Sequence, residues 1–211
     1  MNRFLFLLAC TLFPVLALSQ EEDVEPFSPN EFFIGIGAAF PMEKDPLNVP
    51  GEPKVPASFA LNIGYRRYLE QDVAIGFRVY GYLNKLSGYT VTDQSNVTST
   101  IDFNIETINI ASEGLMIFSN GEVRPYGFIM IGYASGTLSH DKYGELTLNG
   151  FVVGGGLGVQ FAVSQTVAIA LEGVGSFGGG AWKEKPFTNS AGDKFNPSTV
   201  MTTANVLIRF P

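Results

Sequence analysis

Apolar and polar residues alternate with a period of two along most of the chain after position 30. This period is typical of β-strands that bury or expose one apolar face, whereas the helical period of 3.6 fits few segments. In the segment 32–40, for example, large apolar residues at even positions alternate mainly with glycine and alanine at odd positions. The pattern predicts eight strands, at 32–40, 57–68, 73–83, 101–118, 125–135, 151–163, 166–177 and 199–210.

Two of these segments depart from simple alternation. In 101–118 the large apolar positions change from odd to even numbers, which predicts a β-bulge near Glu106 and Thr107. The segment 125–135 is apolar at both odd and even positions, so the pattern does not assign its faces.

The connections between the predicted strands alternate in length. Three are short, at 69–72, 119–124 and 164–165, and four are long and polar, at 42–55, 84–100, 138–149 and 178–198. Because consecutive antiparallel strands run in opposite directions, this order places the four long loops at one end of the sheet. Both ends of the strand region and all short turns then lie at the other end.

Residues 1–19 have the features of a secretory signal peptide. Arg3 precedes an apolar run of about 15 residues, which is short for a membrane-spanning helix of about 20. The run ends in a small-x-small pattern, so we predict cleavage after Ser19. A short, acidic and solvated periplasmic tail follows at 20–30, with Glu31 counted among its acids, and one domain occupies 31–211.

Cys10 offers a second interpretation of the same segment, since the residues around it match a lipoprotein box. The apolar run continues beyond Cys10, which favours a signal-peptide core over a lipid anchor. The mature chain would then contain no cysteine.

Composition narrows the possible functions. Of 211 residues, 45% are hydrophobic and only 16% are charged, against about 25% charged in an average soluble domain. The net charge of −7 argues against nucleic-acid binding, because proteins that bind nucleic acids carry basic patches. One cysteine and one histidine exclude a Cys/His zinc site and a disulfide framework, and no cofactor is expected.

A sheet with one large apolar face and one polar face, in a chain with so little charge, fits a barrel whose apolar side faces lipid. Such a barrel must close, because no backbone polar group can stay unpaired in hydrocarbon. Strands of about 9–11 residues are long enough to cross a membrane, and every predicted strand reaches this length. The fold predicted is therefore all-β, an eight-stranded antiparallel up-and-down transmembrane β-barrel.

The chain resembles the small eight-stranded outer-membrane barrels of Gram-negative bacteria, of the outer membrane protein A/X and opacity-protein type. The alternating strands, the segment 124–133 and the last strand ending at Phe210 carry the resemblance. It implies a location in the outer membrane, contact with outer-membrane lipid and lipopolysaccharide, and a monomer. It also implies recognition of the last strand by the barrel-insertion machinery, although here Pro211 follows the terminal aromatic residue.

The less apolar face of the strands would line the barrel interior. An eight-stranded barrel is just wide enough for side chains to fill. Charges enclosed there are expected to pair, forming either a structural plug or a polar pore with switchable ion pairs. Glu106 is a candidate third acid nearer the loops. The predicted polar network consists of Asn62, Arg66, Arg78, Glu113, Gln160, Glu172, Asn205 and Arg209.

Aromatic residues suggest two surface features. One group is expected to form a lipid-interface girdle at the short-turn end, comprising Tyr65, Tyr68, Phe118, Tyr126, Phe161 and Phe210. A second group lies in the long loops and is a candidate for ligand contact, comprising Tyr89, Trp182, Phe187 and Phe195. Trp182 also fits a position at the outer lipid interface.

No segment predicts catalysis strongly. His140 stands between Ser139 and Asp141, but adjacent residues rarely point together as a nucleophile and its base. The segment 173–178 matches a dinucleotide fingerprint without the helix that this motif needs. We expect a non-enzymatic barrel with a structural or surface-interaction role through its loops. The alternatives are a narrow channel for small solutes, a lipid-modifying enzyme that depends on His140, and a soluble lipocalin-like carrier.

Overall fold

The computed structural model describes residues 29–42, 56–92, 95–119, 121–140, 144–182, 194–195 and 198–211. None of these residues forms a helix long and apolar enough to cross a membrane. They form the strands β1 (Asn30–Pro41), β2 (Ser58–Tyr68), β3 (Val73–Thr92), β4 (Thr98–Ile117), β5 (Val123–His140), β6 (Gly144–Ala162), β7 (Val167–Trp182), β8 (Lys194–Phe195) and β9 (Thr199–Phe210).

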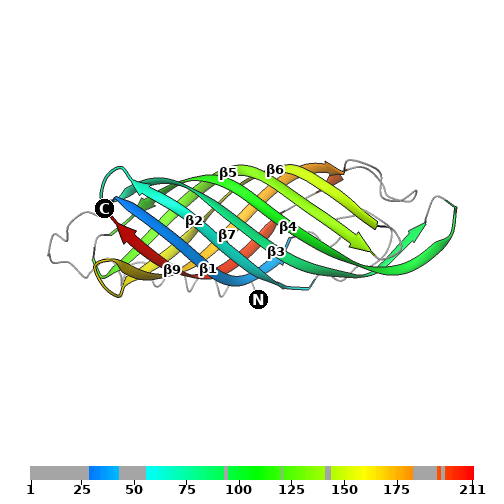
Figure 1. The fold of residues 1–211 in the computed structure, drawn as a ribbon, viewed down its shortest axis with the longest axis horizontal. Helices are drawn as coiled ribbons and strands as arrows, with labels where there is room; N and C mark the ends of the chain where they lie inside the picture. Colours follow the sequence, from blue (N-terminus) through cyan, green and yellow to red (C-terminus); the bar gives the residue numbers. More distant parts are fainter. Residues whose placement is uncertain are drawn as a thin grey trace.

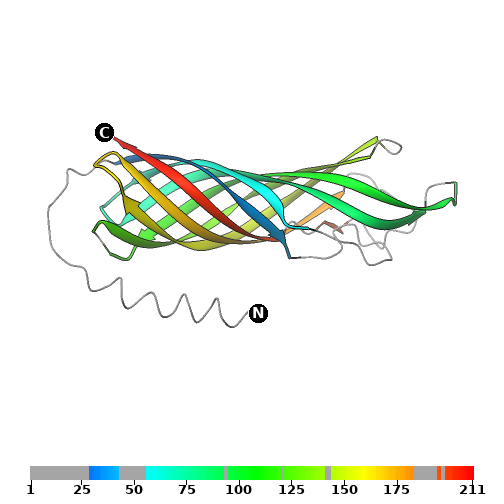
Figure 2. The same ribbon diagram turned by 90° about the horizontal axis from the view of Figure 1, so that it is seen from below.

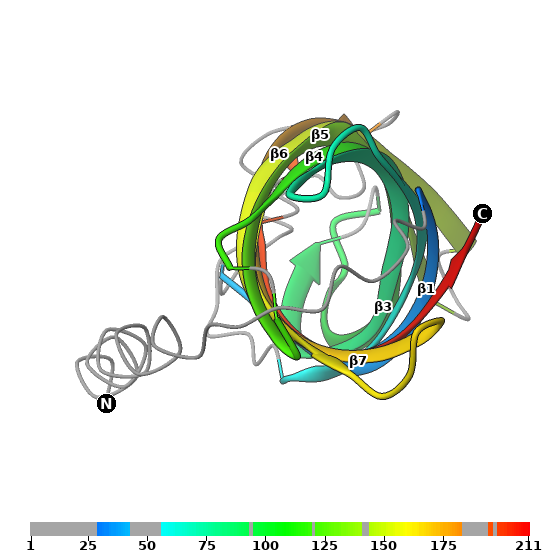
Figure 3. The ribbon, with the colours of Figure 1, turned by 90° about the vertical axis from the view of Figure 1, so that its left-hand side faces the viewer.

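The strands close into a barrel, which Figure 3 shows end-on as a continuous ring. Each strand pairs antiparallel with its neighbour in sequence from β1 to β7, β9 pairs with β7, and β1 closes the ring by pairing with β9. The short strand β8 pairs with β7 in the register that β9 would have if it continued, so β8 and β9 act as one broken strand. The predicted eight-stranded antiparallel barrel is confirmed.

The strands are strongly tilted, as Figure 1 shows. A path of paired residues that leaves β1 at Asn30 and passes once around the barrel returns to β1 at Phe40, a shear of ten residues. With ~3.3 Å per residue and ~4.8 Å between strands, this shear gives a tilt of about 40°. The path runs through Arg67, Ile75, Gly114, Ile129, Gly155, Gly175 and Val200.

The outer face of the barrel carries a continuous apolar band. Side chains such as Ile36, Phe77, Ile110 and Leu171 are more than half exposed. On β6 the outward apolar side chains run from Phe151 to Phe161, a height of roughly 25 Å at the tilt derived above. This is the height of the lipid-facing band of an outer-membrane barrel.

The short turns and the C-terminal end of β9 lie together at one end of the barrel (Figure 2). At the other end β3 and β4 extend furthest, and β3 continues from Leu83, at the edge of the apolar band, to Thr92. The prediction that 84–100 and 138–149 are long loops is therefore wrong. Most of their residues belong to strand extensions, because hairpin pairing of β3 with β4 and of β5 with β6 continues beyond the band.

The β-bulge predicted near Glu106 and Thr107 is absent, since pairing of β3 with β4 is regular there and its irregularity lies between Leu86 and Tyr89. Odd-numbered residues of β4 face inward from Phe103 to Ile117. What changes along the strand is the character of the interior, which is apolar at Phe103 and Ile105 and polar at Asn109 and Glu113.

The faces of β5, which the sequence pattern did not assign, are clear in the structure. Tyr126, Phe128 and Met130 are buried in the interior, whereas Ile129 and Ile131 are 75% and 65% exposed on the outside. Both faces are apolar because one contacts the enclosed aromatic packing and the other belongs to the outer band.

Candidate functional site: the charged interior of the barrel

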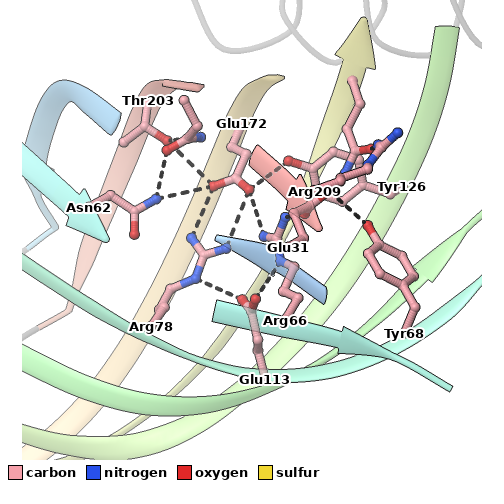
Figure 4. Close-up of polar contacts among 12 residues, drawn as sticks. Glu31, Asn62, Arg66, Tyr68, Arg78, Glu113, Tyr126, Glu172, Thr203 and Arg209 are labelled. Atoms are coloured by element: carbon pink, nitrogen blue, oxygen red, sulfur yellow. Dashed lines mark hydrogen bonds and ion pairs between the residues drawn. The ribbon is translucent and has the colours of Figure 1, made fainter. Parts of the chain in front are cut away.

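The eight residues of the predicted polar network all lie inside the barrel, each no more than 7% exposed. They reach the interior because each occupies an inward position of its strand, in phase with small inward residues such as Gly64 and Gly76. Figure 4 shows the side chains of Arg66, Arg78, Glu113 and Glu172 pointing toward one another from different strands.

Two arginines and two glutamates form the centre of the site. Arg66 donates from Nε to Glu113 (2.6 Å) and from Nη2 to Glu172 (3.0 Å). Arg78 donates from Nε to the second oxygen of Glu113 (2.8 Å) and from Nη1 and Nη2 to both oxygens of Glu172 (3.0 and 3.3 Å). Each carboxylate therefore bridges both guanidinium groups, and the paired, fork-shaped contacts fix all four side chains.

Glu172 has the largest number of partners. Besides both arginines, its carboxylate accepts hydrogen bonds from Tyr126 Oη (2.6 Å), Asn62 Nδ2 and Thr203 Oγ1 (both 3.5 Å). Asn62 Nδ2 also donates to Asn205 Oδ1 (3.0 Å), which links the ion pairs to polar side chains on β9.

A third acid, Glu31, extends the cluster toward the short-turn end. Its carboxylate accepts from Arg66 Nη1 (3.2 Å), Arg209 Nε (3.1 Å) and Tyr68 Oη (3.2 Å). Arg209 also donates from Nη2 to Gln160 Oε1 (2.7 Å). We call the six charged residues Glu31, Arg66, Arg78, Glu113, Glu172 and Arg209 the ion-pair cluster.

The placement of Glu31 in the acidic tail was wrong, because it is fully buried near the start of β1. Its odd number could have revealed this, since it shares the inward face of Phe33, Gly35 and Ala39. The suggestion that Glu106 is the third interior acid was also wrong. Glu106 is an even-numbered residue of β4, where the odd-numbered residues face inward, and it is exposed on the outer face.

Aromatic rings hold both central guanidinium groups. The guanidinium carbon of Arg66 lies 4.3 Å from the centroid of the Phe33 ring and 5.4 Å from that of Tyr126. Arg78 lies 4.2 Å from the Phe128 ring and 5.2 Å from the Phe33 ring. These are distances at which an arginine is attracted to a ring face, and the attraction is stronger without competing water.

Glycines make room for these rings. A Cβ atom at Gly158 would stand 2.4 Å from Cζ of Tyr126, and one at Gly156 would stand 2.7 Å from Cζ of Phe128. A Cβ atom at Gly64 would meet the Phe33 ring at 2.3 Å. The glycine-rich run of β6 therefore lets aromatic side chains of β5 lie against the strand.

Tyr68 and Tyr126, expected in the aromatic girdle, are interior residues that donate to Glu31 and Glu172. Tyr65 and Tyr68 could not share a face, because an odd spacing of three residues puts them on opposite sides of β2. On the outer face, the ring of Tyr65 lies 6.0 Å from that of Phe77 and 6.4 Å from that of Phe210.

The described interior balances its charges, with three arginines and three glutamates in contact with one another. Burying an isolated charge costs several kcal/mol, and a geometry that satisfies nearly every donor offsets this cost. The ion pairs connect side chains from five strands, β1, β2, β3, β4 and β7, and Arg209 connects β9 to them.

The side chains of the four candidate ligand-contact residues lie outside the part of the chain that the structure describes. Phe187 lies outside the described residues, as do the side chains of Tyr89, Trp182 and Phe195, whose backbones belong to β3, β7 and β8. Among the described residues, no group of three His, Cys, Asp or Glu side chains is arranged to hold a metal ion.

Two further motifs have structural explanations. Ser139 and His140 are consecutive residues of β5, so their side chains point to opposite faces, and the His140 ring lies 5.4 Å from the Phe103 ring. The segment 173–178 lies wholly within β7, and the strand, not a helix, continues from it to Trp182.

This barrel has the fold of the small outer-membrane β-barrels. Neisserial surface protein A (NspA) is similar, with a TM-score of 0.52 and 13% identity over 85% of this chain and 97% of NspA. OprG of Pseudomonas aeruginosa is similar with a TM-score of 0.57 and 12% identity, over 89% of this chain and 99% of OprG. No protein-family model and no curated protein sequence matches the chain.

Proposed function

We propose that this protein is an integral outer-membrane β-barrel whose interior is closed by the ion-pair cluster, and that its role is carried by the strand extensions and loops at the cell surface. The observation that carries the proposal is the inverted arrangement of the barrel. Isoleucine, leucine and phenylalanine cover the outside, and arginine and glutamate fill the inside. This arrangement suits lipid and not water as the surrounding solvent.

The packing of the interior supports a closed barrel over a channel. Arg66 and Arg78 are fully enclosed between carboxylates and aromatic rings. A channel for small solutes would require these side chains to separate, which would leave charges unpaired in the barrel. The proposal assigns the protein no catalytic activity.

The membrane-distal part of β3 and β4 supports a role at the surface. Beyond Leu83 the exposed side chains that the structure describes on β3 and β4 include Lys85, Asp102 and Asn104, and Lys85 and Asp102 form an ion pair at 3.5 Å. At the ~40° tilt, the extension from Leu83 to Thr92 projects roughly 20 Å beyond the apolar band. A paired hairpin of this length places residues 95–97 clear of the lipid headgroups, where an external partner can reach them.

Cysteine labelling in cells tests both the location and the orientation. Val97→Cys lies in the exposed β3–β4 connection, and Glu122→Cys lies in the exposed β4–β5 turn at the opposite end. A membrane-impermeant maleimide should label Val97→Cys on intact cells and Glu122→Cys only after the outer membrane is permeabilised. Labelling in the reverse order, or recovery of the protein in the soluble fraction, would overturn the proposal.

A further inference from the structure

Three polar side chains lie together on the outward face of the barrel, at the short-turn end where the apolar band stops. Arg67 of β2 is exposed on this face, two residues beyond Tyr65. Strand pairing places Asn30 of β1 directly beside Arg67, and the hydroxyl of Tyr65 donates a hydrogen bond to Asn30 Oδ1. We call Asn30, Tyr65 and Arg67 the rim site.

The height of the rim site matches the edge of the apolar band. The row of paired residues that passes through Asn30 and Arg67 reaches Gly155 on β6, and Phe161 lies six residues further along β6 toward the short turns. At the ~40° tilt, Arg67 then lies only ~3 Å inside the level of Phe161, which marks the edge of the band. An arginine at this level can keep its stem in hydrocarbon and its guanidinium among lipid headgroups.

The hydrogen-bond donors of the rim site have no partner among the described residues. Arg67 makes neither an ion pair nor a hydrogen bond with them, and neither does the amide nitrogen of Asn30. Of the described side chains, Arg67 is also the only arginine or lysine on the outward face within the height of the band, since Lys85 lies beyond it. A ligand for these donors must accept hydrogen bonds and carry negative charge, as a phosphate does.

Apolar side chains around the donors indicate a lipid and not a soluble anion. The rings of Phe77 and Phe210 lie 6.0 and 6.4 Å from that of Tyr65. Ile75, which pairs with Arg67 from β3, is 52% exposed on the same face. A phospholipid satisfies both parts of this surface, because its phosphodiester accepts hydrogen bonds and its acyl chains cover the rings and Ile75.

The turn after β2 adds negative charge on the side away from the band. Glu70 and Asp72 belong to this turn, and neither carboxylate forms an ion pair with a described residue. Backbone hydrogen bonds from Leu69 and Glu70 to the carbonyl of Val73 (2.8 and 3.3 Å) close the turn next to the rim site. Carboxylates beyond the phosphate attract an ammonium group and repel a second anionic group, so the arrangement favours a zwitterionic headgroup.

We propose that the rim site binds the phosphodiester of a zwitterionic aminophospholipid in the periplasmic leaflet, with the ammonium group toward Glu70 and Asp72. Arg67 and the amide nitrogen of Asn30 donate to the phosphate oxygens, and Tyr65 fixes the amide of Asn30 for this contact. Asn30 also pairs with Phe210, so the lipid lies beside the seam where β1 and β9 close the barrel. This inference rests on the membrane location and orientation given under the proposed function.

Native mass spectrometry of the refolded protein measures the bound lipid directly. The detergent would contain equimolar phosphatidylethanolamine and phosphatidylglycerol with the same acyl chains, and gel mobility would show that each variant is folded. We expect phosphatidylethanolamine to be retained in preference, and Arg67→Gln to lower its retention roughly tenfold, the effect of losing a hydrogen bond to a charged group. Lys85→Gln is the matched control, because it removes the same charge from the outward face beyond the band, and it should retain the lipid.

Several results would overturn the inference. Equal retention by Arg67→Gln and Lys85→Gln would show that Arg67 forms no specific site, and equal or greater retention of phosphatidylglycerol would contradict the zwitterionic headgroup. Displacement of the lipid by inorganic phosphate would indicate a site for a free anion. Asn30→Ala keeps every charge and should also weaken retention, which tests the site if Arg67→Gln folds poorly. Because the cysteine labelling can succeed while lipid retention fails, failure of this inference is distinguishable from failure of the proposed function.

Discussion

Removing the charge of Glu172 should destabilise the barrel more than any other conservative change in its interior. Glu172→Gln keeps the shape of the side chain, but it replaces one carboxylate oxygen by an NH₂ group that faces the guanidinium groups of Arg66 and Arg78. Arg78 would keep only Glu113 as an ionic partner, and Arg66 would keep Glu31 and Glu113. The interior would carry one uncompensated positive charge.

The size of the effect follows from the burial of the pairs. Side chains of Glu172, Arg66 and Arg78 are 1% exposed or less, so solvent screens their interactions little. Removing one partner of such a buried pair costs about 3–5 kcal/mol, which corresponds to roughly a thousandfold change in the unfolding equilibrium. With a urea dependence of ~2 kcal/mol per molar, the unfolding midpoint should fall by about 2 M.

Urea titration of the protein refolded into lipid vesicles measures this shift, with heat-modifiable gel mobility reporting the folded fraction. Glu106→Gln is the matched control, because this glutamate is exposed on the outer face of β4 and its substitution should change stability by less than ~0.5 kcal/mol. Equal midpoints for both variants would refute the reasoning that the ion-pair cluster holds the barrel together.

Three further tests probe other parts of the structure by the same urea titration, two of them with a matched control substitution. Tyr126→Phe should lower the free energy of unfolding by about 1.5–3 kcal/mol, because it removes a 2.6 Å hydrogen bond to a buried carboxylate. An unchanged midpoint would show that Tyr126 contributes only through packing. Gly158→Ala should cost about 1–3 kcal/mol by displacing the Tyr126 ring, whereas Gly173→Ala, where a Cβ meets nothing within 4 Å, should be tolerated. Ile129→Arg, in the lipid-facing band, should cost about 2–4 kcal/mol in vesicles, and Thr137→Arg, on the same strand beyond the band, should cost much less; equal losses would contradict the membrane position of the band.

The architecture could be predicted from the sequence because side chains alternate strictly along a strand. A period of two identifies the strands. Whether a residue has an odd or an even number within its strand then assigns residues such as Arg78 and Glu172 to the interior. The same rule would have placed Glu31 and Tyr68 correctly. Both were misplaced because neighbouring residues of similar type, the acidic tail and the aromatic rim, suggested a different grouping.

Other features could not be obtained from local patterns. Which arginine meets which glutamate depends on the shear of ten residues, and this shear is a property of the closed barrel and not of any one strand. The change of the interior from polar at Glu113 to apolar at Phe103 resembled a change of face, and so predicted a bulge that does not exist. The lengths of the loops were overestimated, because the polar strand extensions beyond the apolar band have the composition of loops.

Single-channel recording tests the central claim most directly, that the ion-pair cluster closes the barrel. The chain without residues 1–19 would be refolded in detergent, shown to be folded by its gel mobility, and incorporated into a planar lipid bilayer. The structure predicts a folded protein without steady conductance steps, because the side chains of Arg66, Arg78, Glu113 and Glu172 fill the interior. Stable, discrete conductance steps from the folded protein would contradict a closed interior and favour a channel.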